Sequence, residues 1–207
     1  MKRTIIGLLT LTFLTCFHMQ NVKAQSQVSG GIKGGVSIFN FTGKDVSGSG
    51  IYTALNGGLF VDFSPSRVFS VQPELNVKSE GANYGMMING FPYRRARVTY
   101  LQVPILLKLS PFNNGSKPAV SPSIFAGPAF NVMLFKQLNG EVLPDVTGGY
   151  SIDQNPKQTA YSVIGGVGVT IKNLYIIDLR YEKGLTNVFK QGDIKSGGIM
   201  ITTGFKF

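Results

Sequence analysis

The sequence predicts an all-β fold, an eight-stranded antiparallel transmembrane β-barrel that follows a cleaved signal peptide. Three observations lead to this prediction. The chain begins like an exported protein, its later residues alternate between apolar and polar with the two-residue period of strands, and the connections between these strands are alternately short and long. A barrel with short turns at one rim and long loops at the other produces this pattern.

The first 24 residues have the composition of a signal peptide. Lys2 and Arg3 precede an apolar run over 5–17, and residues 22–24 (Val-Lys-Ala) place small side chains where a signal peptidase cleaves. A membrane-spanning helix needs roughly 20 apolar residues, and this run is shorter. We therefore expect cleavage before Gln25.

The predicted mature chain, 25–207, contains neither cysteine nor histidine. The one cysteine of the sequence, Cys16, and the one histidine, His18, both lie in the predicted signal peptide. The mature chain then lacks a thiol nucleophile, a conventional zinc site and a Ser-His-Asp triad. We expect no enzyme, no catalytic residue, no metal and no cofactor. Because the composition does not change along 25–207, we expect one barrel domain.

Eight segments of the mature chain alternate in this way, and we predict each of them to be a strand. In chain order they are 32–41, 51–63, 69–78, 99–109, 121–135, 159–171, 175–182 and 199–207. In five of them the apolar face is clear. These apolar sets are Ile51, Leu55, Leu59, Val61 and Phe63; Phe69, Val71, Pro73, Leu75 and Val77; Leu101, Val103, Ile105, Leu107 and Leu109; Tyr175, Ile177, Leu179 and Tyr181; and Ile199, Ile201, Thr203, Phe205 and Phe207. The alternation is weaker in 32–41, 121–135 and 159–171.

The connections between these segments fall into two classes. Three are short or moderately short: 64–67, 110–119 and 172–173. Three are long and rich in Gly, Asn and Asp: 80–95, 136–158 and 184–195. An even number of strands places both chain ends at the rim with the short turns, which is the periplasmic rim of an outer-membrane barrel.

Scarcity of charge decides which face of the barrel points outward. Charged residues make up 14% of the chain, against roughly 25% in ordinary soluble domains. A soluble lipocalin-like periplasmic carrier, the alternative with the same strand count, needs a charged exterior. The chain also ends on Phe207, two residues after Phe205, and a terminal aromatic residue is what the barrel-insertion machinery commonly reads. We expect the apolar face to meet the lipid of the cell outer membrane.

Prolines conflict with part of this prediction. Pro73, Pro104, Pro122 and Pro128 all fall inside predicted strands, although proline cannot donate a ladder hydrogen bond. We expect them at bulges or at strand starts.

Several segments together resemble the PorT-like family of outer-membrane β-barrels, which is common in Bacteroidetes. The matching stretches, in the order expected for that family, are Gly30-Gly31-Ile32-Lys33-Gly34-Gly35, Val71-Gln72-Pro73-Glu74-Leu75, Tyr100-Leu101-Gln102-Val103-Pro104, Ala126-Gly127-Pro128-Ala129 and Leu179-Arg180-Tyr181-Glu182-Lys183-Gly184-Leu185. The resemblance implies the fold and the outer-membrane location, and prolines at positions like Pro73 and Pro104 are usual in that family. One named member takes part in protein secretion, so secretion or envelope proteins are possible partners.

Charged residues on the polar face are predicted to fill the lumen. An eight-stranded barrel has an interior just wide enough for side chains, and buried charges must be paired. Glu74, Lys78, Asp178, Arg180 and Glu182 are the expected ion network. The favoured reading is a plugged barrel of structural, recognition or assembly and secretion-accessory type, and the alternative is a narrow gated channel.

A basic cluster marks a second candidate site, for anionic lipid. Arg94, Arg95 and Arg97 lie where a long connection meets a strand, and guanidinium groups suit phosphate. Loss of the signal peptide lowers the net charge from +10 to about +7. Lipopolysaccharide is the expected counterpart, whereas an exported chain does not meet nucleic acid. The alternative is a solvated basic rim with general attraction to lipid headgroups.

Overall fold

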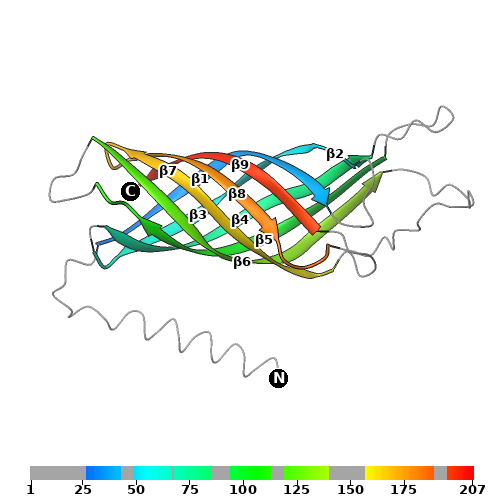
Figure 1. The fold of residues 1–207 in the computed structure, drawn as a ribbon, viewed down its shortest axis with the longest axis horizontal. Helices are drawn as coiled ribbons and strands as arrows, with labels where there is room; N and C mark the ends of the chain where they lie inside the picture. The colour runs from blue at the N-terminus through cyan, green and yellow to red at the C-terminus, as the bar shows by residue number, and fades with distance from the viewer. Residues whose placement is uncertain are drawn as a thin grey trace, which may run out of the picture.

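The computed structural model describes residues 27–42, 49–66, 68–84, 94–112, 119–139, 157–188 and 195–207. They form a closed antiparallel β-barrel of eight long strands (Figure 1). The long strands are β1 (Gln27–Thr42), β3 (Tyr52–Ser64), β4 (Phe69–Tyr84), β5 (Arg94–Leu109), β6 (Val120–Asn139), β7 (Thr159–Ile171), β8 (Tyr175–Gly184) and β9 (Lys195–Lys206). A two-residue strand, β2 (Ser49–Gly50), pairs with the end of β4. The predicted signal peptide, 1–24, lies outside the described residues. Within the described residues, no helix is long and apolar enough to cross a membrane.

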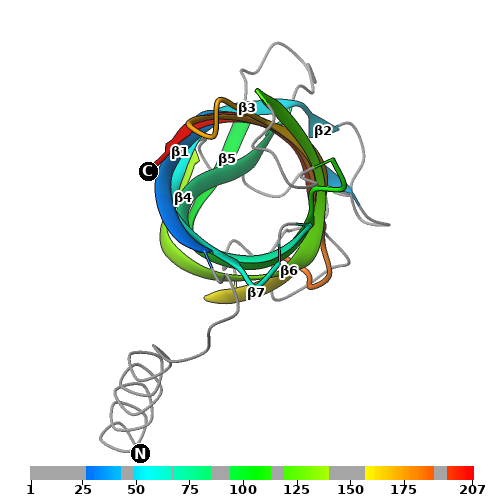
Figure 2. The same cartoon turned by 90° about the vertical axis from the view of Figure 1, so that its left-hand side faces the viewer.

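The barrel closes where its first and last strands meet. Each long strand pairs with the next along the chain, and β1 pairs with β9 from Gly31–Lys206 to Thr42–Lys195. Beyond these pairs, the backbone N–H of Phe207 donates to the carbonyl oxygen of Gly30 at 2.8 Å. The view along the barrel shows the closed ring (Figure 2). Closure leaves no unpaired strand edge in the wall, as a membrane requires.

All eight predicted strands are confirmed, but several are longer than predicted. β4 runs to Tyr84 and β5 begins at Arg94, which pairs with it, while β6 continues to Asn139. The predicted loop 80–95 is therefore wrong at both ends, and the predicted loop 136–158 is wrong at its start. Residues of a paired ladder beyond the lipid need no apolar face, so the alternation that predicts strands fades there.

The turn between β7 and β8 is as short as predicted. Lys172 and Asn173 have φ angles of 51° and 54°. Two successive residues in the left-handed region are typical of a type I′ hairpin, whose twist matches that of the flanking strands.

Three of the strand prolines lie side by side on neighbouring strands. Pro73, Pro104 and Pro128 occupy one level of β4, β5 and β6, and the ladders between these strands are interrupted there. The expectation of bulges is wrong for these three, since the register shift between the described parts of β5 and β6 falls at Thr99 and Tyr100. Each proline removes one donor, and grouping them confines the missing hydrogen bonds to a single stretch of wall. Pro122 lies near the start of β6, as expected.

The outer wall is apolar and the interior is largely polar. Leu55 and Ile201 on the outer wall are 79% and 56% exposed, whereas Lys78 and Glu182 in the lumen are 1% exposed. A soluble carrier has the opposite arrangement, so the lipocalin-like alternative is wrong. The lumen also holds apolar side chains that the alternation did not predict, among them a cluster of Leu106, Phe125, Ala129 and Ile164 on the inner wall of β5 to β7.

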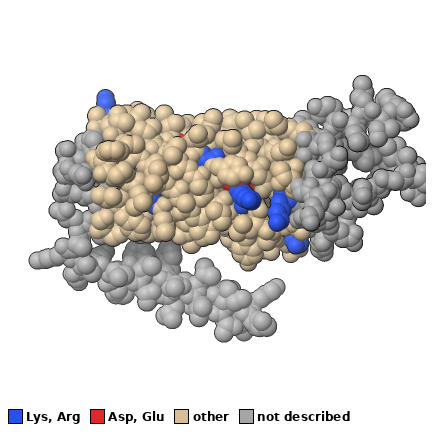
Figure 3. All heavy atoms as spheres, viewed as in Figure 1, with Lys and Arg blue, Asp and Glu red and all other residues tan. Residues whose placement is uncertain are grey.

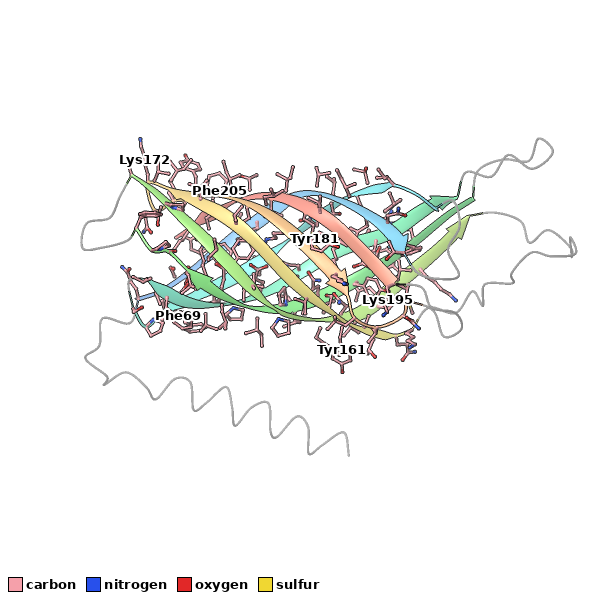
Figure 4. The ribbon with its side chains drawn as sticks, in the orientation of Figure 1. Phe69, Tyr161, Lys172, Tyr181, Lys195 and Phe205 are labelled. Atoms are coloured by element: carbon pink, nitrogen blue, oxygen red, sulfur yellow. The ribbon has the colours of Figure 1, made fainter. Side chains whose placement is uncertain are left out.

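Aromatic pairs lie near both ends of the outer wall. The rings of Phe130 and Tyr161 are 5.3 Å apart towards the long-loop end, and those of Tyr175 and Phe205 are 5.2 Å apart towards the short-turn end. Figure 4 shows Tyr161 and Phe205 towards these opposite ends. Aromatic girdles of this kind border the apolar band of membrane barrels, where amphipathic rings lie at headgroup level.

Candidate functional site

The middle of the lumen holds a compact group of four charged side chains. Arg180 on β8 donates from Nη1 and Nη2 to the two carboxylate oxygens of Glu74 on β4, at 2.7 and 2.8 Å. Its Nη2 also lies 2.9 Å from Oδ2 of Asp178, two residues earlier on the same face of β8. Lys33 on β1 donates to Asp178 at 2.7 Å and to Glu74 at 3.3 Å. The Lys33–Glu74–Asp178–Arg180 group is balanced in charge and ties three strands together across the barrel.

Neutral side chains complete the hydrogen bonds of this group. Gln72 and Asn76, two residues on either side of Glu74, donate to its carboxylate at 2.5 and 3.0 Å. Period-two alternation places all three on the inner face of β4. Glu74 thus accepts hydrogen bonds from four side chains, as a buried carboxylate requires.

A second ionic group lies towards the long-loop end. Lys78 on β4 bonds to Glu182 on β8 at 2.5 Å and also to Glu80 on its own strand. Gln102 on β5 donates to Glu182 at 2.9 Å and to Asn131 on β6 at 2.8 Å. Hydrogen bonds therefore cross the lumen from β4 to β8 and continue around the wall.

The five residues of the predicted ion network all lie in the lumen, divided between these two groups. Glu74, Asp178 and Arg180 belong to the first group, and Lys78 and Glu182 to the second. Sequence reasoning missed two partners. Lys33 lies in the predicted strand 32–41, but nothing in the alternation marks it as the partner of Asp178. Glu80 falls in the predicted loop 80–95.

Aromatic rings cover the cations of both groups. Nζ of Lys33 lies 4.7 Å from the ring centre of Phe60, and Nζ of Lys78 lies 5.1 Å from that of Phe39. The guanidinium of Arg180 lies 5.2 Å from the ring centre of Phe125. Cation–π contacts strengthen when the cation is desolvated. A cavity between the two groups, lined by Lys33, Lys78, Arg180 and their neighbours, has a volume of about 10 Å³, room for a single water molecule.

The predicted lipid-binding arginines can be placed only in part. Arg97 donates from Nε and Nη2 to the hydroxyl of Ser79, at 3.2 and 3.0 Å, and Ser79 lies 2.8 Å from the hydroxyl of Thr99. Arg94 and Arg95 belong to β5, but their side chains lie outside the described ones. Arg97 is thus held against the barrel wall near the long-loop end. No group of His, Cys, Asp or Glu among the described residues is suited to hold a metal.

Comparison with known proteins identifies the kind of barrel. A family model described as outer membrane protein beta-barrel domain matches residues 20–190. No curated protein matches the sequence. Among solved structures, the outer membrane protein OprG from Pseudomonas aeruginosa is 12% identical, with a TM-score of 0.49, over 90% of this chain and 99% of that chain.

Two further solved structures are similar at the same level. Neisserial surface protein A is 12% identical, with a TM-score of 0.48, over 87% of this chain and 99% of that chain. Ail, the attachment invasion locus protein of Yersinia pestis, is 13% identical, with a TM-score of 0.45, over 87% of this chain and 99% of that chain. That structure of Ail is a complex with the heparin analogue sucrose octasulfate.

Proposed function

Because this chain belongs to the outer membrane protein β-barrel domain family, we propose that it is a filled barrel whose lumen is a structural plug. Its place is the outer membrane. The observation that carries the proposal is the forked pair of Arg180 and Glu74, which joins β8 to β4 across the lumen. Separating two buried charges that are held this closely costs free energy, so the pair favours a closed lumen. Recognition, assembly or secretion-accessory work then falls to the outer surface, and we propose no catalytic role.

A filled lumen predicts the absence of steady conductance. The purified barrel in planar lipid bilayers is expected to show no sustained nanosiemens-scale current, because both ionic groups and the aromatic rings around them occupy the path. Single-channel recording makes the measurement, with a porin of known conductance as positive control. Steady openings of the pure protein would favour the narrow gated channel instead.

The arginine cluster supports a second role, contact with anionic lipid. Arg97 lies near the long-loop end and donates through only part of its guanidinium to Ser79. We propose that Arg94, Arg95 and Arg97 contact lipopolysaccharide phosphate. Replacing all three with serine is expected to weaken lipopolysaccharide binding by the purified barrel roughly 10- to 100-fold, at up to about 1 kcal/mol per basic residue. Unchanged binding would reduce the cluster to a solvated basic rim.

The resemblance to PorT-like barrels supports a finer proposal about partners. Its matching stretches contain both Glu74 and Arg180, and one named member of that family takes part in protein secretion. We propose that a secreted or envelope protein binds the long-loop end. Cross-linking in whole cells, followed by identification of the attached proteins, tests this.

A further inference from the structure

Charge is distributed unevenly between the two sides of the barrel wall. The acidic side chains of the described residues are all buried in the lumen: Asp62, Glu74, Glu80, Asp178 and Glu182. Among the described residues, the charged side chains of the outer wall and rims are basic. Those at or near the long-loop end are Arg97, Lys136, Lys157, Lys183 and Lys195, whereas Lys172 lies in a turn at the opposite rim. Figure 3 shows most of the basic side chains of this view towards the long-loop end, with almost no acidic atoms.

Three of these lysines follow one another around the rim and have no counter-ion among the described residues. Lys157 lies two residues before the start of β7, Lys183 is near the end of β8, and Lys195 begins β9. Backbone hydrogen bonding from Lys157 to Val188, at 2.8 Å, holds the start of β7 beside the chain that leaves β8. Lys183 is paired with Gly197, two residues from Lys195. The three lysines therefore lie on, or directly before, the adjacent strands β7, β8 and β9 at one end of the barrel.

Tyrosines lie just below the lysines on the same outer wall. Tyr181 precedes Lys183 by two residues and Tyr161 follows Lys157 by four, and both tyrosines are 54% exposed. Figure 4 shows Tyr161, Tyr181 and Lys195 on this part of the barrel. Tyrosine lies at headgroup level in membrane barrels. Lys157 and Lys183, which lie four and two residues from these tyrosines towards the long-loop end, are therefore at the height of the lipid phosphates.

Small residues leave room for a ligand between these side chains. A Cβ atom added to Gly197 would meet no atom closer than the carbonyl oxygen of Glu182, at 3.6 Å, and the hydroxyl of Tyr181, at 3.9 Å. Lower on the wall, a Cβ atom added to Gly165, the neighbour of Tyr181 on β7, would meet nothing within 4 Å. The surface is thus open beside Tyr181, both next to the lysines and in the apolar band beneath them.

We propose that Lys157, Lys183 and Lys195 bind the phosphate groups of the lipid A portion of lipopolysaccharide. Three ammonium groups with no counter-ion in the described part of the chain attract a polyanion, and the apolar wall beside Gly165 accepts an acyl chain of the same molecule. The orientation of the barrel agrees, because lipopolysaccharide occupies the leaflet at the long-loop rim. This site is separate from the arginine cluster on β5, and it rests on the outer-membrane location but not on the plugged lumen.

The test measures lipid binding to the purified barrel in detergent by native mass spectrometry. The probes are lipid A, the same lipid A with its phosphates removed, and phosphatidylglycerol. The triple variant Lys157→Gln, Lys183→Gln, Lys195→Gln is compared with Lys172→Gln, a lysine at the opposite rim. A heat-dependent shift on a detergent gel verifies that each variant is folded.

Lipid A binding is expected to fall roughly 10- to 100-fold in the triple variant and to stay unchanged in Lys172→Gln. Dephosphorylated lipid A is expected to bind the wild-type barrel weakly, which tests the need for phosphate, whereas the triple variant tests whether these three lysines bind it. Undiminished binding in the triple variant would overturn the proposal. An equal loss of lipid A and phosphatidylglycerol would also overturn it, because the occupant would then be a phospholipid. Conductance in bilayers tests the plugged lumen separately.

Discussion

Replacing Arg180 with methionine is expected to lower the free energy of unfolding by about 3–5 kcal/mol, the usual cost of removing one partner from a buried ion pair. Methionine fills similar space but leaves Glu74 and Asp178 with Lys33 as their shared cation. Two carboxylates then face one ammonium group in a lumen that water scarcely enters. The measurement is urea unfolding of the barrel in lipid vesicles, monitored by far-UV circular dichroism because the chain has no tryptophan.

A double variant separates the loss of charge balance from the loss of packing. Arg180→Met with Glu74→Gln leaves Lys33 and Asp178 as a balanced pair 2.7 Å apart. Its destabilisation is expected to be smaller than the sum of the two single effects, because each single variant leaves an uncompensated charge. Strict additivity would show that Arg180 and Glu74 are not coupled. A loss below about 1 kcal/mol for Arg180→Met alone would show that the group contributes little to stability.

Sequence reasoning identified the strands because a membrane barrel imposes a simple rule on each of them. Lipid on one side and a polar lumen on the other require alternation, so residues such as Leu179 and Arg180 reveal their faces without any tertiary information. The rule weakens where its cause ends. Glu80 and Arg94 lie on paired strands beyond the clearest alternation, and for that reason both fall in the predicted loop 80–95.

Partners inside the lumen were harder to predict than faces. Alternation shows that Lys33 and Asp178 point inward, but they are 145 residues apart, on strands that do not pair with each other. Which inward side chains meet depends on the stagger of the strands around the barrel, and stagger is a property of the closed wall. Phe39 and Phe60, which cover two of the cations, were missed for a related reason. An aromatic residue on the inner face breaks the pattern that was used to find that face.

An arginine placed on the outer wall is also expected to lower the free energy of unfolding strongly, by an amount that depends on whether lipid or water covers that wall. Leu179, between the two aromatic levels of β8, is 49% exposed, and Leu185, at the long-loop rim, is 54% exposed. Leu179→Arg is expected to cost about 2–4 kcal/mol and Leu185→Arg about 0–1 kcal/mol, because a charge is penalised by its depth in the hydrocarbon. Urea unfolding in vesicles compares the two variants directly. Since both leucines are about equally exposed, a water-covered wall would tolerate both arginines alike, and equal costs would contradict a lipid-facing exterior.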